Sequence, residues 1–148
     1  MSSNGEGGGL VLLAYDGSDQ AKHAIEQAGK QLGTGRAAIV LTVWQPVETI
    51  AYAGFAAGIG EMDTELKEQA ESVAAEGAEL ARAAGFEPEP VVERGAGAWE
   101  QIVDLADQRE AELIVVGSRG RSAIRSVLVG SVATAVVWHT KRPVLVVH

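Results

Sequence analysis

Short apolar runs that alternate with longer helical segments constrain the fold of this chain more than any other feature. Most of the runs are rich in β-branched residues and apolar at consecutive positions, which is typical of strands buried on both faces of a parallel sheet. The glycine-rich turns between runs and helical segments indicate sharp changes of chain direction. We expect strands at Leu10–Tyr15, Ala37–Val43, Glu89–Glu93, Leu113–Val116 and Pro143–Val147.

The segments between these runs have helical periodicity. We expect helices over Gln20–Leu32, residues 63–84, Ala98–Arg109 and residues 131–140. Asp63 is expected to cap the second helix and Gly85 to end it. The apolar positions of the four helices are Ala21, Ala24, Ile25, Ala28 and Leu32, then Leu66, Ala70, Val73, Gly77, Leu80, Ala81 and Ala84, then Trp99, Ile102, Val103 and Ala106, and finally Val132, Ala133, Val136 and Val137.

Strands that alternate with helices predict an α/β domain, a doubly wound five-stranded parallel sheet with helices on both faces. Right-handed crossovers make 3-2-1-4-5 the most economical strand order. Prolines at the entry to the third strand place that strand at an edge. The 148 residues suit one domain with a single core. We expect residues 1–9 to form a flexible tail, residues 10–148 the domain, and Trp44–Gly60 a long variable loop.

In this order the sheet reverses direction between its first and fourth strands. Ligands of such sheets bind at the carboxyl ends of the strands beside that point. Those ends are Asp16 and Gly117. The topology therefore predicts a binding crevice between them.

A loop punctuated by glycines follows the fourth strand and leads to a helix start. Gly117 and Gly120 open the loop, and Gly130 and Ser131 close it. Glycine lets the backbone approach an anion closely, and the first turn of a helix directs unpaired N–H groups and the positive end of its dipole at that anion. Ser131 can add a donor or cap the helix. The loop therefore indicates a phosphate or nucleotide site. The alternative is that these glycines only allow the chain to turn after the strand, as glycines in that place often do.

The distribution of charge agrees with a small anionic ligand at this loop. A formal net charge of −8 argues against general affinity for nucleic acid or an anionic membrane. From Gly117 onward there is no Asp or Glu. Cations are attracted to the C-terminal ends of helices, which explains Lys141 and Arg142 well. The same attraction explains the three arginines of the loop less well. The basic residues are Arg119, Arg121, Arg125, Lys141 and Arg142.

The composition limits the chemistry and the cellular compartment that we expect for the protein. There is no cysteine, which excludes a disulfide, a thiolate metal site and a cysteine nucleophile. No apolar run approaches the roughly 20 residues that a spanning helix needs, and residues 1–9 lack the pattern of a signal peptide. We expect a cytoplasmic protein that binds neither nucleic acid nor a membrane.

The glycine motif resembles that of a known family. Gly117-x-x-Gly120, nine further residues and Gly130-Ser131 are similar to the nucleotide-binding motif of the universal stress protein family. Asp16-Gly17-Ser18 and the closing Lys141-Arg142-Pro143-Val144-Leu145-Val146-Val147 match as well. The resemblance covers the chain from Leu10 to His148. It implies a stress-response protein of the ATP-binding branch, usually a homodimer.

The resemblance also implies which residues contact the nucleotide. Ala14, Tyr15 and Asp16 would line the adenine and ribose end, and Val43 would pack on the base. Tyr15 is bulkier than the small residue often found there, and Ala133 stands where a hydroxyl residue is common. The residues implied around the ribose and phosphates are Val116, Gly117, Arg119 and Gly120, then Gly130, Ser131, Val132 and Ala133.

Two further expectations concern a ligand contact of Asp16 and a dimer contact of the last strand. Asp16 can hold a ribose hydroxyl or share a Mg²⁺ ion with the phosphates, or it can only close an Asx-turn beside the first helix. The strand Val144–Val147 is an apolar, almost uncharged edge of the kind that pairs with another chain. We therefore expect a two-fold dimer through this strand, consistent with the family.

Three functions remain open from the sequence. The first is a nucleotide-binding regulatory module, and the second is a structural dimer of the same fold that uses no nucleotide. The third is an enzyme, either a slow ATP hydrolase or a pyrophosphate-cleaving ligase. His23, His139 and His148 lie on separate elements, and neither a P-loop nor a Gly-x-Ser-x-Gly elbow is present. The sequence assigns no catalytic residue, and we expect at most weak ATPase activity.

Overall fold

The protein forms the five-stranded parallel sheet that the sequence predicts. The computed structural model describes residues 8–47, 59–119 and 129–148. The strands lie in the order β3-β2-β1-β4-β5, and every neighbouring pair is parallel. Both expected edges, β3 and β5, are confirmed. The strands are β1 Val11–Ala14, β2 Ala37–Trp44, β3 Glu87–Arg94, β4 Leu113–Gly117 and β5 Val144–Val147.

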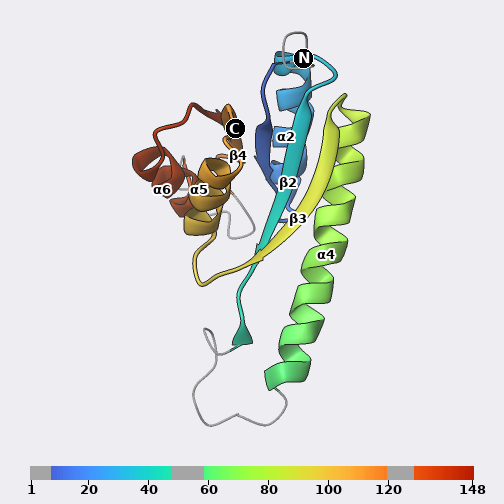
Figure 1. The fold of residues 1–148 in the computed structure, drawn as a ribbon, viewed down its shortest axis with the longest axis vertical. Helices are drawn as coiled ribbons and strands as arrows, with labels where there is room; N and C mark the ends of the chain where they lie inside the picture. Colours follow the sequence, from blue (N-terminus) through green and yellow to red (C-terminus); the bar gives the residue numbers. More distant parts are fainter. Residues whose placement is uncertain (1–7, 48–58, 120–128) are drawn as a thin grey trace.

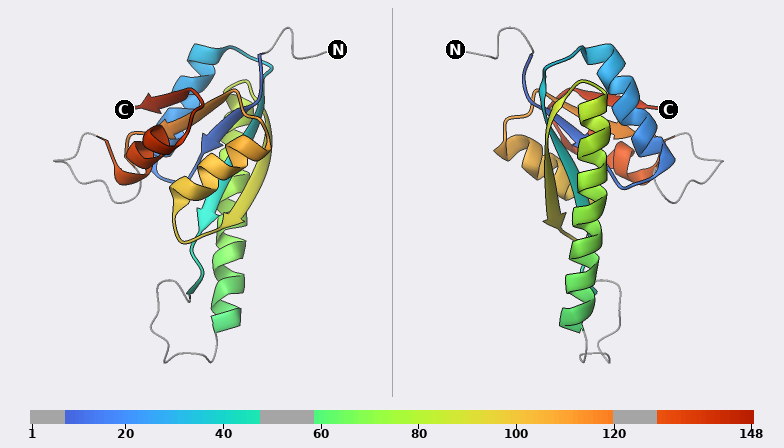
Figure 2. Two further views of the ribbon diagram at one scale, coloured as in Figure 1. Left: turned by 60° about the vertical axis from the view of Figure 1, so that its left-hand side comes forward. Right: turned by 90° about the vertical axis from the view of Figure 1, so that its right-hand side faces the viewer.

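Of the helices in the described residues, two cover each face of the sheet (Figures 1 and 2). Helices α2, Asp19–Leu32, and α4, Ile59–Ala83, lie on one face. Helices α5, Ala98–Gln108, and α6, Ser131–His139, lie on the other. No helix within the described ranges is both long enough and apolar enough to cross a membrane.

Alternate residues of the central strands build two separate hydrophobic layers. Val11 and Leu13 of β1 pack in the layer under α2 and α4. Leu12 of the same strand packs in the layer under α5 and α6. Consecutive side chains of a strand point to opposite faces, so a strand in the centre of this sheet must be apolar at every position. This requirement explains the apolar runs in the sequence.

The edge strand β3 tolerates two prolines because of its position. Pro88 lies opposite Ala38 of β2, and Pro90 lies opposite Val40. Proline donates no backbone hydrogen bond, and an edge strand loses no ladder bond if its N–H positions face solvent. The strand is longer than the predicted Glu89–Glu93 and contains both prolines.

The prediction that Asp63 caps the second helix is wrong. Helix α4 begins at Ile59, so Asp63 lies inside its first turns. The carboxylate of Asp63 instead accepts a hydrogen bond of 2.7 Å from the backbone N–H of Val47. A tertiary acceptor role therefore replaces the local capping role, and the helix starts four residues earlier than its cap signal suggests.

The buried faces of the helices differ from the predicted ones in part. The fully buried side chains of α4 are alanines, Ala70, Ala74, Ala78 and Ala81, whereas the predicted Leu66, Val73 and Leu80 are half-buried. In α6, Ala133 and Val136 are buried, but Val132 and Val137 are exposed. Alanine on the inner face lets α4 approach the sheet closely. Residues 1–7 of the expected tail and most of the expected loop lie outside the described residues.

Gly77 lies where α4 packs tightly against the sheet, and its replacement provides a test. A Cβ atom there would lie 2.6 Å from Cδ2 of Tyr15 and 2.7 Å from Cγ1 of Val40. We predict that Gly77→Ala lowers the free energy of unfolding by about 1–3 kcal/mol, as overpacked cores do. Gly60→Ala is the matched control on the same helix, because a Cβ atom at Gly60 meets nothing within 4 Å. Urea denaturation measures the free energy of unfolding of both variants. If Gly77→Ala is as stable as Gly60→Ala, α4 does not pack against Tyr15 and Val40 as tightly as the structure shows.

Candidate functional site

A pocket of about 800 Å³ opens at the carboxyl ends of β1 and β4. This is the point where the strand order reverses. The structure brings together every predicted nucleotide-contacting residue except Gly120, which lies outside the described residues. The predicted residues that line the pocket are Ala14, Tyr15, Asp16, Val43, Val116, Gly117, Arg119, Gly130, Ser131, Val132 and Ala133.

The start of α6 forms one wall of the pocket. Gly130 occupies the N-cap position in an extended conformation, and no side chain caps the helix there. The N–H of Gly130 donates to the carbonyl of Ser118, which joins the two arms of the glycine loop. Ser131 is therefore the first helical residue and not the cap. The first-turn N–H groups of α6 need an acceptor that its own cap does not supply.

Asp16 closes a turn between β1 and α2. Its Oδ1 accepts a hydrogen bond of 2.9 Å from the N–H of Ser18, and the Ser18 hydroxyl in turn caps α2 by accepting from Ala21 N–H. Gly17 supplies the turn with its φ of 83°. The Asx-turn considered from the sequence is therefore present. Because Asp16 also lines the pocket, the turn holds one oxygen and leaves Oδ2 for a ligand.

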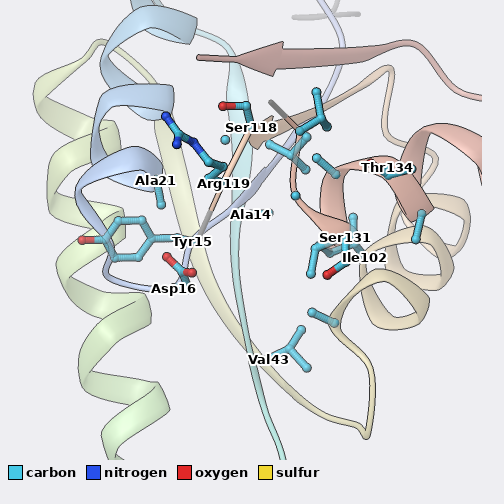
Figure 3. Close-up of a pocket in the computed structure, with 18 of the residues that line it drawn as sticks. Ala14, Tyr15, Asp16, Ala21, Val43, Ile102, Ser118, Arg119, Ser131 and Thr134 are labelled. Carbon is cyan, nitrogen blue, oxygen red and sulfur yellow. The ribbon is translucent and has the colours of Figure 1, made fainter. Parts of the chain in front are cut away.

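Tyr15 contributes its backbone to the pocket, while its ring lies in the core on the other side. Figure 3 shows the ring directed toward α4, away from Ser131 and Val43. The Tyr15 hydroxyl donates a 2.6 Å hydrogen bond to Glu76, whose carboxylate also lies 3.4 Å from Nζ of Lys22. Thr42 donates from its hydroxyl to the Tyr15 carbonyl at 2.9 Å. These bonds fix the end of β1 on both sides.

The Tyr15–Glu76 pair changes the pKa of both groups. Burial, together with the neighbouring Glu76, raises the pKa of Tyr15 above its ordinary value. The hydrogen bond from Tyr15 lowers the pKa of the Glu76 carboxyl, and Lys22 acts in the same direction. The pair is therefore a neutral phenol bound to a carboxylate at neutral pH.

The electrostatics of the pocket favour an anion near Arg119. Its side chain is half-buried, and its Nε is enclosed without an acceptor among the described residues. Asp16 is the only acid among the described residues that line the pocket. The described ranges contain no group of three or more His, Asp or Glu residues suited to a metal ion. A buried donor without an acceptor is an environment that a phosphate oxygen satisfies, and Figure 3 shows the Arg119 side chain directed toward α2, away from Ser131.

Several lining residues were missed by the sequence reasoning. Ala98 and Ile102 reach the pocket from α5, and Ser118 is fully buried behind it. Thr134, Ala135, Trp138 and His139 belong to α6. The signal for the α6 residues was present, because positions three, four and seven after Ser131 share its side of a helix. No comparable signal placed α5 against the pocket.

Comparisons with known proteins give consistent results. The model of the universal stress protein family matches residues 10–148. A universal stress protein of Thermus aquaticus is 34% identical, over 93% of this chain and 97% of its own. The solved structure of MJ0577 from Methanocaldococcus jannaschii has a TM-score of 0.80 at 25% identity and covers 94% of both chains. A universal stress protein solved in complex with cAMP is 31% identical, with a TM-score of 0.60, over 95% of this chain and 96% of that one.

The Tyr15–Glu76 hydrogen bond is tested by Tyr15→Phe. At neutral pH we expect this variant to be less stable by about 1 kcal/mol, because Glu76 is half exposed and the bond is partly screened. The pH dependence is more diagnostic. A raised folded-state pKa stabilises the native protein below the unfolded-state pKa of about 10, and this stabilisation is lost as pH rises above it.

The parent should therefore lose more stability than Tyr15→Phe between about pH 8 and about pH 10.5. Urea denaturation at both pH values measures this difference. The chain's other tyrosine, Tyr52, is the same in both proteins and cancels in the comparison. Parallel losses in parent and variant would show that the Tyr15 phenol is not held in its neutral form.

Proposed function

The chain belongs to the universal stress protein family, and on this premise we propose that it is a regulatory module that binds an adenine nucleotide, ATP in particular. One observation carries the proposal. The uncapped start of α6 opens into a pocket with apolar walls at the point where the strand order reverses. Unpaired N–H groups beside an apolar slot suit a ligand that has phosphates at one end and a flat base at the other.

The phosphates would lie at the start of α6. The first-turn N–H groups and the helix dipole provide the main attraction. Arg119 supplies a guanidinium whose Nε lacks an acceptor among the described residues, and a charge-assisted bond to phosphate would satisfy it. Ala133 has no hydroxyl and is buried in the core. The hydroxyls of Ser131 and Thr134, both of which line the pocket, take its place.

The base would lie against the ends of β1 and β2. Ala14, Val43 and Ile102 give that side of the pocket an apolar surface, and Figure 3 shows Val43 and Ile102 among the side chains that line it. The cAMP complex of a relative that is 31% identical supports an adenine nucleotide as the ligand class. The choice of ATP within this class rests on the glycine spacing from Gly117 to Ser131, which resembles that of the ATP-binding branch.

Binding, with no dedicated turnover, is the function that these groups support. Asp16, the only acid that the described residues bring to the pocket, is held by Ser18 N–H. In that position it suits a Mg²⁺ ion carried by the nucleotide, or a ribose hydroxyl. We propose it for that role and not as a general base. The position of β5 at the edge of the sheet, paired only with β4 among the described strands, supports the accompanying proposal of a two-fold dimer through Val144–Val147.

Gly130→Val tests the phosphate seat. The backbone of Gly130, with φ −72°, suits any residue, so a loss of binding would come from filled space. A Cβ atom there already lies 3.2 Å from the Ser118 carbonyl, and the valine methyl groups would extend over the helix start. We expect the affinity for ATP, measured by isothermal titration calorimetry, to fall at least about tenfold.

Gly97→Val is the matched control for this variant. Gly97 precedes α5 as Gly130 precedes α6, and its Cβ atom would approach only movable side chains, those of Glu100 and Trp99. This control should bind ATP as the parent does. If Gly130→Val also binds like the parent, the phosphates do not lie at the start of α6.

Asp16→Asn tests the role of the carboxylate. The amide oxygen of asparagine still accepts from Ser18 N–H, so the turn is preserved while the charge is lost. We expect the affinity for ATP in the presence of Mg²⁺ to fall about tenfold. In EDTA the affinity should be unchanged or higher, because the carboxylate no longer repels the phosphates. Titration calorimetry under both conditions measures the effect. An equal loss in both would assign Asp16 to a ribose hydroxyl, and no loss in either would assign it to the turn alone.

A further inference from the structure

Thr42 is a buried polar residue in an otherwise apolar strand. Strand β2 reads Ala-Ala-Ile-Val-Leu-Thr-Val-Trp, and Thr42 is its only polar member. The residue is 5% exposed, and its hydroxyl donates to the Tyr15 carbonyl at 2.9 Å. A buried hydroxyl costs free energy unless it is hydrogen-bonded, and a valine would fill the same space without that cost. The reason for a threonine here therefore lies in the carbonyl that it binds.

The Tyr15 carbonyl lies where the ladder between β1 and β2 ends. The last paired residues are Ala14 and Leu41, and the last backbone bond runs from Tyr15 N–H to the Leu41 carbonyl at 2.9 Å. In a parallel ladder the next bond would run from Val43 N–H to the Tyr15 carbonyl. That bond would pair Tyr15 with Thr42, and the register of β1 and β2 stops before this pair. The Thr42 hydroxyl binds the carbonyl in place of the Val43 N–H.

The N–H of Val43 is directed to the β1 side of β2. Successive residues of a strand turn their backbone groups alternately to its two neighbours in the sheet. Trp44, the next residue, faces β3, because its carbonyl accepts from Gly95 N–H at 3.0 Å. Val43 itself lines the pocket. The end of the ladder therefore leaves a backbone donor at the pocket without a backbone acceptor among the described residues, and such donors are normally paired.

The turn after β1 depends on the same bond. Gly17, with its φ of 83°, and the Asx-turn of Asp16 onto Ser18 N–H take the chain away from the sheet directly after Tyr15. A chain that leaves a ladder early normally strands a buried carbonyl, and an unpaired buried acceptor is costly. The hydroxyl of Thr42 supplies the missing donor from a side chain. It thereby allows β1 to end at Ala14.

We propose that Thr42 is a positioning residue for the base of the nucleotide: its hydroxyl occupies the Tyr15 carbonyl, ends the ladder there and leaves Val43 N–H free to donate to a ring nitrogen of the base. This inference rests on the proposed function of the pocket. Thr42 does not line that pocket, so it acts on the ligand only through the backbone. The ring nitrogens of adenine are hydrogen-bond acceptors, and Ala14 and Ile102 supply apolar surface for its faces.

Removal of the hydroxyl is expected to close the gap between the strands. In Thr42→Val the Tyr15 carbonyl loses its donor, and Val43 N–H is the donor that ladder geometry places next in line for it. Buried carbonyls are rarely left unpaired. The ladder should therefore extend by one bond and consume the donor that the base needs. Thr42→Ser keeps the hydroxyl and should behave as the parent does.

Amide hydrogen exchange of the unliganded protein, followed by NMR, tests the first step without any nucleotide. We expect Val43 N–H to exchange at least about tenfold faster in the parent and in Thr42→Ser than in Thr42→Val. Slow exchange of Val43 N–H in the parent overturns the inference, because the donor would then not be free. Equal exchange in the parent and in Thr42→Val overturns it as well.

Titration calorimetry tests the second step with two probes, ATP and inorganic triphosphate, which has no base. Loss of one hydrogen bond to the base should weaken ATP binding to Thr42→Val about fivefold. The affinity for triphosphate should stay within about twofold of that of the parent, because this probe reaches only the phosphate seat. Unchanged ATP affinity overturns the inference. An equal loss for both probes also overturns it, because the pocket as a whole would then be damaged.

Thr64→Val is the matched control. The Thr64 hydroxyl also donates to a backbone carbonyl, that of Gly60 at 2.9 Å, but this bond lies within α4 and Thr64 does not line the pocket. The control should match the parent in exchange at Val43 and in both affinities. If the parent binds neither ATP nor triphosphate, the proposed function fails. The exchange measurement then still decides whether Thr42 keeps the Val43 N–H free.

Discussion

Burial of the two central strands on both faces is the constraint on which the rest of this structure depends. Val11, Leu12 and Leu13 of β1, with Ile114 and Val115 of β4, are all at most 1% exposed. Apolar surface removed from water contributes roughly 25 cal/mol per Å², so these strands are stable only with helices on both sides. The right-handed crossovers that supply those helices run in opposite directions from β1 and β4. The two carboxyl ends are thereby left side by side and uncovered, and the pocket is formed there.

The site that results is built mainly from backbone and less from reactive side chains. Gly130 and Gly117 let the loop arms approach, and the start of α6 presents its N–H groups without a side-chain cap. From the family resemblance a hydroxyl residue is expected in place of Ala133, and this construction accommodates the change. Its side chain belongs to the core, so the change leaves the backbone donors in place. The Tyr15 ring likewise packs toward α4, where its hydroxyl binds Glu76, and Tyr15 contributes to the pocket through its backbone.

Family membership and fold agree. The fold is similar to those of MJ0577 and of a universal stress protein solved in complex with cAMP. The pocket of this chain includes residues along one side of α6, among them Thr134, Ala135 and Trp138.

The sequence by itself determined the strands, their order and the residues around the glycine loop. These follow from short-range rules, since apolar runs, helix periodicity and turn glycines depend on neighbours in the chain. The tertiary structure alone decided that Asp63 accepts from Val47, that the Tyr15 ring turns to Glu76, and that Ile102 and Trp138 reach the pocket. Each of these depends on which side chain from a distant element comes within contact distance. Local periodicity gives the face on which a residue lies, but only the packing of helices against the sheet sets what that face meets.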